Sequence, residues 1–236
     1  MSTPTDIADV IARVRSDHLT YLNERCLQDL ADAVQEAEDR GLQGQVIEAG
    51  TALGGSAILM ALVKSAEREM RVYDAFDMIP PPTDKDGEDV HKRYARITSG
   101  KSKGIGGGTY YGYHDDLLGE VTASFEQYGV PVKESNVELV KGYFEDTLHV
   151  DGPVAVAHLD ADWYESTMTC LQRIEPHLVA GGRLVIDDYY QWSGCKKAID
   201  EYFARRDGYE FVKLGRLHIV KGEDARKLRW WQKKKS

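Results

Sequence analysis

The sequence predicts an α/β fold with a mostly parallel sheet and helices on both of its faces. Short apolar runs typical of buried strands alternate with longer stretches in which apolar residues recur at helical spacing. Parallel neighbours need a crossover connection between them, so this alternation favours a parallel sheet. A glycine-rich turn after the first apolar run, and aspartates after two later runs, indicate ligand sites at the ends of strands.

The first part of the chain is predicted to be helical before the sheet begins. Apolar residues at helical spacing from Ile7 to Val14 predict a first helix, and the same pattern over 21–37 predicts a second. Glycines at 41 and 44 end this helical region, which we treat as an N-terminal extension of about 1–44. The next predicted elements are a strand at 45–49, a turn at 51–56, a helix at 57–63 and a strand at 71–74.

Residues 78–115 interrupt the alternation. They contain a run of prolines, a charged stretch, a glycine-rich stretch and the tyrosines Tyr110, Tyr111 and Tyr113. Segments of this length in a compact domain are usually lids or disordered. We therefore expect one domain over 1–236 that carries a lid-like insertion at about 78–115.

The alternation resumes after the insertion. A helix is predicted at 116–128 and a second one at 166–178, which Gly181 and Gly182 are expected to end. Strands are predicted at 137–141, 154–159, 183–186, 209–214 and 216–220. The last two strands are close enough in sequence to be joined by a tight turn.

Composition and charge restrict the class of function. The chain has 236 residues and a formal charge of -9, a poor match for nucleic-acid or anionic-membrane binding. Cys26, Cys170 and Cys195 form no C-x-x-C pair, so a zinc site or disulfide framework is not expected. No leader pattern opens the sequence, and no apolar run reaches the roughly 20 residues that span a bilayer. We expect a cytoplasmic protein with no membrane partner.

The turn after the first predicted strand suits a nucleoside-containing cofactor. Gly50, Gly54 and Gly55 let the backbone approach a ligand, and the following helix offers an electropositive N-terminus. Asp74 ends the next strand, where an acid can bind ribose hydroxyls or simply cap a helix. The turn lacks the G-x-G-x-x-G pattern, so a turn without a ligand and a nicotinamide-dependent sugar oxidoreductase both stay open.

Two acidic clusters follow the late strands. Asp160 and Asp162 end one strand, and Asp187 and Asp188 end the next. Residues two apart on a strand face the same side, so Asp160 and Asp162 are predicted to enter one crevice. Carboxylate oxygens suit a hard divalent cation such as Mg²⁺ or Ca²⁺. Helix capping could account for one aspartate of each cluster, but not for all four.

Four motifs give the chain a resemblance to a known family. They are VIEAGTALGGSA (46–57), GYFEDTL (142–148), HLDADWYESTMTCL (158–171) and VIDDYYQWSGCKKAIDEY (185–202). Over about 18–205 the chain resembles the macrocin O-methyltransferases, which methylate sugar hydroxyls of natural products. The resemblance implies the class I, Rossmann-like methyltransferase fold, a seven-stranded sheet with an antiparallel last strand, and a need for S-adenosylmethionine and Mg²⁺.

The resemblance also implies roles for particular residues. Asp160, Asp187 and Asp188 match the Mg²⁺ ligands, and Asp162 matches the proposed general base, for which His114 is a rival. The residues that match the cofactor site are Glu48, Ala49, Gly50, Gly54, Ser56, Asp74, Gly142, Phe144 and Asp160. The family usually has a tryptophan-arginine pair where this chain has Ala52 and Leu53.

The partner is expected to be a small-molecule glycoside. The insertion departs from the family pattern in the region that covers the acceptor, so a non-sugar vicinal diol stays an alternative. We also expect a homo-oligomer, a dimer or larger. The basic stretch 226–235 could contact a partner or another subunit, although a frayed terminus is the commoner outcome for such a segment.

Overall fold

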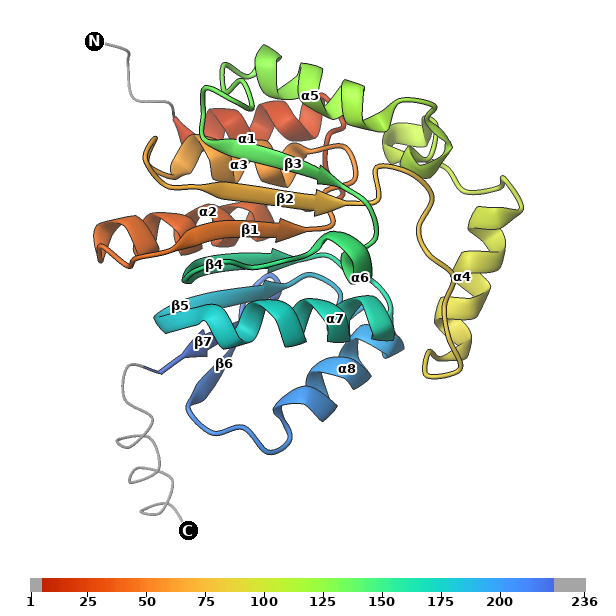
Figure 1. The fold of residues 1–236 in the computed structure, drawn as a ribbon. Coiled ribbons are helices and arrows are strands. Elements are labelled where there is room, and N and C mark those ends of the chain that lie inside the picture. The colour runs from red at the N-terminus through yellow and green to blue at the C-terminus, as the bar shows by residue number, and fades with distance from the viewer. Residues whose placement is uncertain (1–5, 223–236) are drawn as a thin grey trace.

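The computed structural model describes residues 6–222, so the basic stretch 226–235 lies outside the described residues. Seven strands form one sheet in the order β3-β2-β1-β4-β5-β7-β6 (Figure 1). The strands are β1 (Gln45–Ala49), β2 (Met70–Asp74), β3 (Val137–Lys141), β4 (Val154–Leu159), β5 (Leu178–Ile186), β6 (Tyr209–Lys213) and β7 (Leu217–Lys221).

The sheet is parallel except for its last strand. β1 to β5 pair in parallel, whereas β7 runs antiparallel between β5 and β6. The register places Glu48 of β1 opposite His158 of β4, which brings their side chains together near the carboxyl end of the sheet. The prediction of a mostly parallel sheet with an antiparallel last strand is confirmed.

Helices cover both faces of the sheet, as expected. Alternate residues of β1 enter two separate cores: Val46 packs with α1, α2, α3 and α5, and Ile47 packs with α7 and α8. The helices are α1 (Ile7–Ser16), α2 (Glu24–Asp39), α3 (Gly55–Val63), α4 (Glu88–Thr98), α5 (Leu117–Gln127), α6 (Phe144–Thr147), α7 (Tyr164–Ile174) and α8 (Ser193–Phe203). Within 6–222 no helix is both long enough and apolar enough to cross a membrane.

The predicted helix at 166–178 is wrong in its bounds. α7 ends at Ile174, and a 3₁₀ turn at Glu175–His177 contains Pro176, which cannot continue an α-helix. Gly181 and Gly182 were expected to end this helix, but both lie inside β5. The pairing of β5 with β4 shifts register between Leu178 and Arg183, and glycines are common at such irregularities.

The insertion at 78–115 contains regular structure that its sequence does not reveal. α4 spans Glu88–Thr98 and buries only Val90 and Ile97, too few apolar positions for a helical period to stand out. Figure 1 shows α4 beyond the carboxyl ends of the central strands, apart from the helices that cover the faces. α8 was also not predicted, and it packs against α7 on one face of the sheet.

Candidate active site

The carboxyl ends of β4 and β5 bring three of the predicted ligands together. Asp160 follows β4 and donates its N–H to the Ala49 carbonyl at 2.9 Å, while Asp187 follows β5 and donates to the Leu159 carbonyl at 2.9 Å. The parallel ladder therefore continues one residue past each strand. Asp160, Asp187 and Asp188 each offer a carboxylate oxygen, and these oxygens lie within 4.8 Å of one another.

Asp162 reaches the same pocket by a route that strand alternation does not predict. β4 ends at Leu159, so its alternation does not orient Asp162. Instead the Asp162 backbone adopts a left-handed conformation with φ of 52°, and its N–H donates to Asp188 Oδ2 at 3.0 Å. Asp160 and Asp162 both line the pocket, as predicted, but a turn rather than a strand places Asp162 there.

Burial and mutual repulsion perturb these carboxyls. Burial, followed by the charges of neighbouring aspartates, raises the pKa of Asp160, Asp162 and Asp188 well above its usual range. Burial would raise the pKa of Asp187 too, but His158 and Arg216 outweigh it and lower that pKa. A divalent cation among Asp160, Asp187 and Asp188 would offset the repulsion, and an all-oxygen donor set fits Mg²⁺.

A buried histidine and an arginine support Asp187. His158 Nδ1 lies 2.8 Å from Glu48 Oε1, and His158 Nε2 lies 3.8 Å from Asp187 Oδ1. Burial favours the neutral ring, yet Asp187 and Glu48 raise the pKa of His158 to about 10. Arg216 Nε donates to Asp187 Oδ1 at 2.7 Å. Asp187 thus receives positive charge from two directions.

The turn after β1 is held by Asp74. The N–H groups of Thr51 and Ala52 donate to Asp74 Oδ2 at 2.7 and 3.1 Å, and the Phe76 N–H donates to Oδ1 at 2.7 Å. Burial raises the pKa of Asp74 despite these hydrogen bonds. Asp74 lines the pocket, so it can orient the turn and still face a ligand.

Gly50 is required by a close approach of backbone. Its φ is +88°, and a Cβ there would lie 1.9 Å from the Asp160 carbonyl oxygen. A side chain at this position would therefore push the turn after β1 away from Asp160. Gly50 thus allows the turn after β1 to pack against the loop that carries Asp160.

The predicted cofactor residues divide into two groups. Some line a pocket of about 350 Å³ at the carboxyl edge of the sheet: Gly50, Asp74, Gly142, Phe144 and Asp160. The others are buried beneath it and are not part of its lining within the described residues: Glu48, Ala49, Gly54 and Ser56. Glu48 faces His158, and Gly54 is the N-cap of α3, in a left-handed conformation. Their contact with a cofactor stays a prediction.

The insertion forms the remaining wall of the pocket. Ile79, Pro80, Arg93, Tyr110 and Tyr111 line it. Trp163 and Trp192, from the same loops as the aspartates, line it too. His114, the rival base, lies against Glu120 with its Nδ1 2.7 Å from Oε2, and it is not among the lining residues. The position of His114 favours Asp162 as the base.

Comparison with known proteins decides the family. The profile described as Macrocin-O-methyltransferase (TylF) matches residues 16–210. This chain belongs to the macrocin O-methyltransferase family. It is therefore an O-methyltransferase, and the resemblance predicted from the four motifs is confirmed. The family assignment favours methyl transfer over the nicotinamide-dependent alternative.

Characterised relatives of this macrocin-type enzyme act on glycosylated natural products. An 8-demethyl-8-(2,3-dimethoxy-alpha-L-rhamnosyl)-tetracenomycin-C 4'-O-methyltransferase from Streptomyces olivaceus is 31% identical, over 86% of this chain and 70% of the relative. A mycinamicin III 3''-O-methyltransferase from Micromonospora griseorubida is 30% identical, over 85% of this chain and 76% of the relative.

Solved structures place the macrocin-type chain in the class I S-adenosylmethionine-dependent methyltransferase fold. The O-methyltransferase NovP aligns with a TM-score of 0.69 at 25% identity, covering 86% of this chain and 81% of NovP. The calicheamicin methyltransferase CalS11 aligns with a TM-score of 0.59 at 16% identity, covering 94% of this chain and 88% of CalS11. The second match bears on the fold alone.

Two contributors to this family member's site were missed by sequence reasoning. Arg216 lies in the turn between β6 and β7, far from every motif, and only the antiparallel insertion of β7 beside β5 brings it to Asp187. Arg93 lies on α4, the helix that was not predicted. A lone arginine in a polar stretch carries no local signal of a site.

Proposed function

We propose that this chain is an Mg²⁺-dependent O-methyltransferase that uses S-adenosylmethionine to methylate a sugar hydroxyl of a glycosylated natural product. The observation that carries the proposal is the set of carboxylates of Asp160, Asp187 and Asp188, whose oxygens converge at the carboxyl edge of the sheet. Asp187 and Asp188 are buried and Asp160 is half-buried. Charged groups removed from water are costly unless they are compensated, so three converging carboxylates support a bound cation.

Asp160, Asp187 and Asp188 would hold the cation through their carboxylate oxygens. When bound, Mg²⁺ would supply positive charge that lowers the pKa of an acceptor hydroxyl. His158 and Arg216 would keep Asp187 ionised and oriented, because both face its Oδ1. Asp162, fixed by its N–H bond to Asp188, would accept the hydroxyl proton.

The cofactor would lie along the turn after β1. Gly50 and Asp74 would contact its nucleoside, and Gly142 with Phe144 would border its adenine end. The chain's main task is then to align the acceptor oxygen with the methyl group. Such orientation can contribute about 7–11 kcal/mol to the lowering of the barrier.

The acceptor would occupy the aromatic side of the pocket. Tyr110 and Tyr111 from the insertion line the same pocket as the aspartates, with their ring centroids 4.3 Å apart. Such a wall can pack on a sugar face or a planar aglycone while it excludes water. The names of the relatives, which include a rhamnosyl-tetracenomycin methyltransferase, support a small-molecule glycoside.

The proposal includes the organisation of the whole chain. We treat it as one methyltransferase domain with an N-terminal helical extension, a lid-like insertion at 78–115 and a homo-oligomeric state that sedimentation can test. A cytoplasmic location is supported by its three cysteines, all of which are free and buried.

Calorimetry with S-adenosylhomocysteine and, in parallel, with NAD tests the cofactor. We expect S-adenosylhomocysteine to bind and NAD not to bind, and the reverse result would contradict the proposal. Transfer from S-adenosylmethionine to a panel of glycosylated natural products should stop in EDTA and return with Mg²⁺. Undiminished turnover in EDTA would overturn the metal role.

A further inference from the structure

Asp86, which lies in the insertion, caps α7, one of the helices that pack on the sheet. The N-cap position of α7 is Trp163, whose side chain makes no capping hydrogen bond. The N–H of Tyr164, the first residue of α7, donates instead to Asp86 Oδ1 at 2.8 Å. Asp86 Oδ2 accepts the Thr83 N–H at 2.9 Å, which fixes the carboxylate. A carboxylate at this position satisfies an orphan N–H and complements the helix dipole.

Asp89 caps the second helix in the same way. α8 has Trp192 at its N-cap, again without a side-chain cap. The Ser193 N–H donates to Asp89 Oδ2 at 2.9 Å, and Ser193 Oγ donates to Oδ1. Burial opposes ionisation of Asp89, but these hydrogen bonds prevail and lower its pKa. One short stretch of the insertion therefore completes two helices that provide no cap of their own.

Two glycines make room for these contacts. A Cβ at Gly194 of α8 would lie 2.0 Å from Asp86 Oδ1, and a Cβ at Gly87 would lie 2.3 Å from Ser193 Oγ. Trp163 Nε1–H also donates a hydrogen bond to the carbonyl oxygen of Pro80, in the insertion, at 2.9 Å. The insertion and the two helix starts thus fit together without space for an added methyl group.

Each capped helix begins a few residues after the proposed metal ligands. Asp160 precedes α7, and Asp187 and Asp188 precede α8. The two loops are linked by the hydrogen bond from the Asp162 N–H to Asp188 Oδ2. They are also linked by the edge-on packing of the two N-cap tryptophans, whose ring centroids lie 5.8 Å apart. We therefore expect movement of the starts of α7 and α8 to displace the carboxylates.

We propose that Asp86 and Asp89 are positioning residues that couple docking of the insertion to formation of the metal site. This inference rests on the proposed function, because it requires that Asp160, Asp187 and Asp188 bind Mg²⁺. Docking fixes the helix starts and hence the ligands. By linkage, bound Mg²⁺ must favour docking by the same factor. The acceptor pocket would then be closed mainly in the metal-loaded enzyme.

The test measures Mg²⁺ affinity and hydrogen exchange in the full chain. Calorimetry with Mg²⁺ should show about tenfold weaker binding for Asp86→Ala/Asp89→Ala than for wild type, the range found when groups that support metal ligands are removed. In wild type, Mg²⁺ should slow amide exchange over 78–98, and in the double variant this protection should be lost. S-adenosylhomocysteine affinity should stay within about twofold.

Asp84→Ala is the matched control, since Asp84 is an exposed aspartate of the same stretch. It should behave as wild type. If Asp86→Ala/Asp89→Ala lowers the melting temperature but binds Mg²⁺ like the control, the aspartates are merely structural and the coupling is overturned. If the double variant does not fold, Asp89→Ala and Ser193→Ala alone carry the test.

The outcomes for the coupling can be told apart from those for the proposed Mg²⁺-dependent function. Binding of S-adenosylhomocysteine without any Mg²⁺ binding in wild type would overturn the metal site and, with it, the coupling. Mg²⁺ binding in wild type that is equally tight in Asp86→Ala/Asp89→Ala would overturn the coupling and leave the metal site intact.

Discussion

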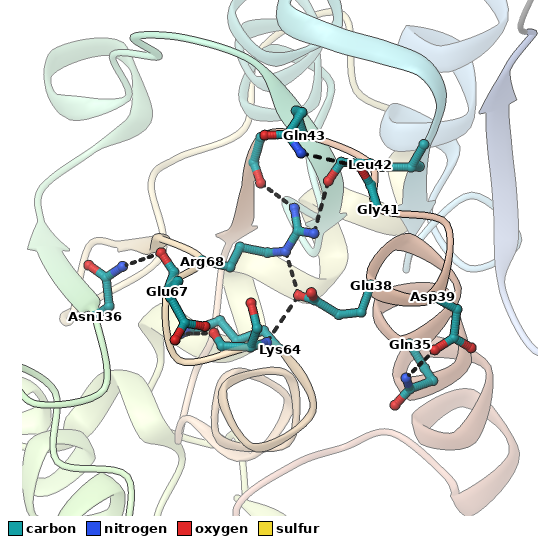
Figure 2. Close-up of polar contacts among 12 residues, drawn as sticks. Gln35, Glu38, Asp39, Gly41, Leu42, Gln43, Lys64, Glu67, Arg68 and Asn136 are labelled. Carbon is teal, nitrogen blue, oxygen red and sulfur yellow. Dashed lines mark hydrogen bonds and ion pairs between the residues drawn. The ribbon is translucent and has the colours of Figure 1, made fainter.

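The two ends of the strands carry buried polar clusters that differ in how their charges are paired. At the amino ends of β1 and β2, Arg68 binds Glu38 at 2.5 Å and donates to the carbonyls of Leu42, at 2.9 Å, and Gly44 (Figure 2). At the carboxyl ends, Arg216 and His158 both face Asp187. Burial, followed by repulsion between neighbouring aspartates, raises the pKa of Asp160, Asp162 and Asp188.

The difference separates stability from function. Arg68 has only 9% of its side chain exposed and is surrounded by acceptors, so its cluster stabilises the fold. The aspartates of the site repel one another and make the fold less stable unless a cation is bound. A bound cation can stabilise the protein only where like charges repel one another in its absence. The carboxyl end of the sheet is such a place, and it is where the proposed Mg²⁺ would bind.

Asp160→Asn should have the largest effect on methyl transfer. Removing one charged metal ligand should lower transfer by at least about 100-fold, the upper range seen for groups that merely support such ligands. The same change removes a carboxylate that lies close to Asp187 and Asp188, so the melting temperature in EDTA should rise. Transfer assays with added Mg²⁺ and thermal unfolding in EDTA measure the two effects.

Its control lies at the other end of the sheet. Glu38→Gln alters a half-buried carboxyl of the arginine cluster, and it should lower the melting temperature while transfer at a permissive temperature is unchanged. A fall in EDTA stability for Asp160→Asn would show that the aspartates are stabilising as they stand and would contradict the comparison.

Arg68→Met should be the most destabilising of these substitutions. It leaves the half-buried Glu38 without its cation and takes donors from two carbonyls, which should cost about 3–5 kcal/mol of unfolding free energy. Urea unfolding measures the loss, and transfer below the unfolding transition should persist. Gln35→Ala, which removes only an exposed bond to Asp39, should stay within about 0.5 kcal/mol of wild type.

Mg²⁺ should stabilise the protein through one end of the sheet only. At 100 times its dissociation constant, a ligand that binds the folded state alone adds about 2.7 kcal/mol. We expect this gain in wild type and in Arg68→Met, but not in Asp160→Asn. Thermal unfolding over a series of Mg²⁺ concentrations provides the measurement. An equal gain in Asp160→Asn would place the cation elsewhere.

The contrast also shows what the sequence could predict. The strands and the aspartates at their ends follow from local apolar runs, because Val154–Leu159 and 183–186 indicate buried strands whatever packs beside them. The mostly parallel pairing follows from the alternation of strands with helices. Gly181 and Gly182 led to a wrong helix end, since a glycine pair signals a helix end and a strand irregularity equally well.

The contacts that complete the site could not be predicted in this way. Arg216 reaches Asp187 across 29 residues, and Asp86 reaches Tyr164 across 78. Such pairs depend on the placing of β7 and of the insertion, and no pattern within either segment encodes the partner. Asp162 enters the pocket through a left-handed turn that alternation along a strand does not describe.

The smallest expected effect is a pH dependence from the arginine cluster. Burial would raise the pKa of Glu38, but hydrogen bonds from Arg68 and from the Ser65 N–H outweigh it and lower that pKa. Between the lowered value and the ordinary carboxyl value near about 4.3, the unfolded chain binds more protons, so stability falls as pH decreases through this window. The contribution is complete above the ordinary value.

Urea unfolding at a series of pH values from about 6 down to the acid transition should therefore show a shallower loss of stability in Glu38→Gln than in wild type. Asp39→Asn is the matched control, because Asp39 is an exposed neighbour that accepts only from Gln35 in Figure 2. Identical acid slopes for Glu38→Gln and wild type would mean that Arg68 does not hold Glu38 ionised. The amino end of the sheet would then be no better paired than the carboxyl end.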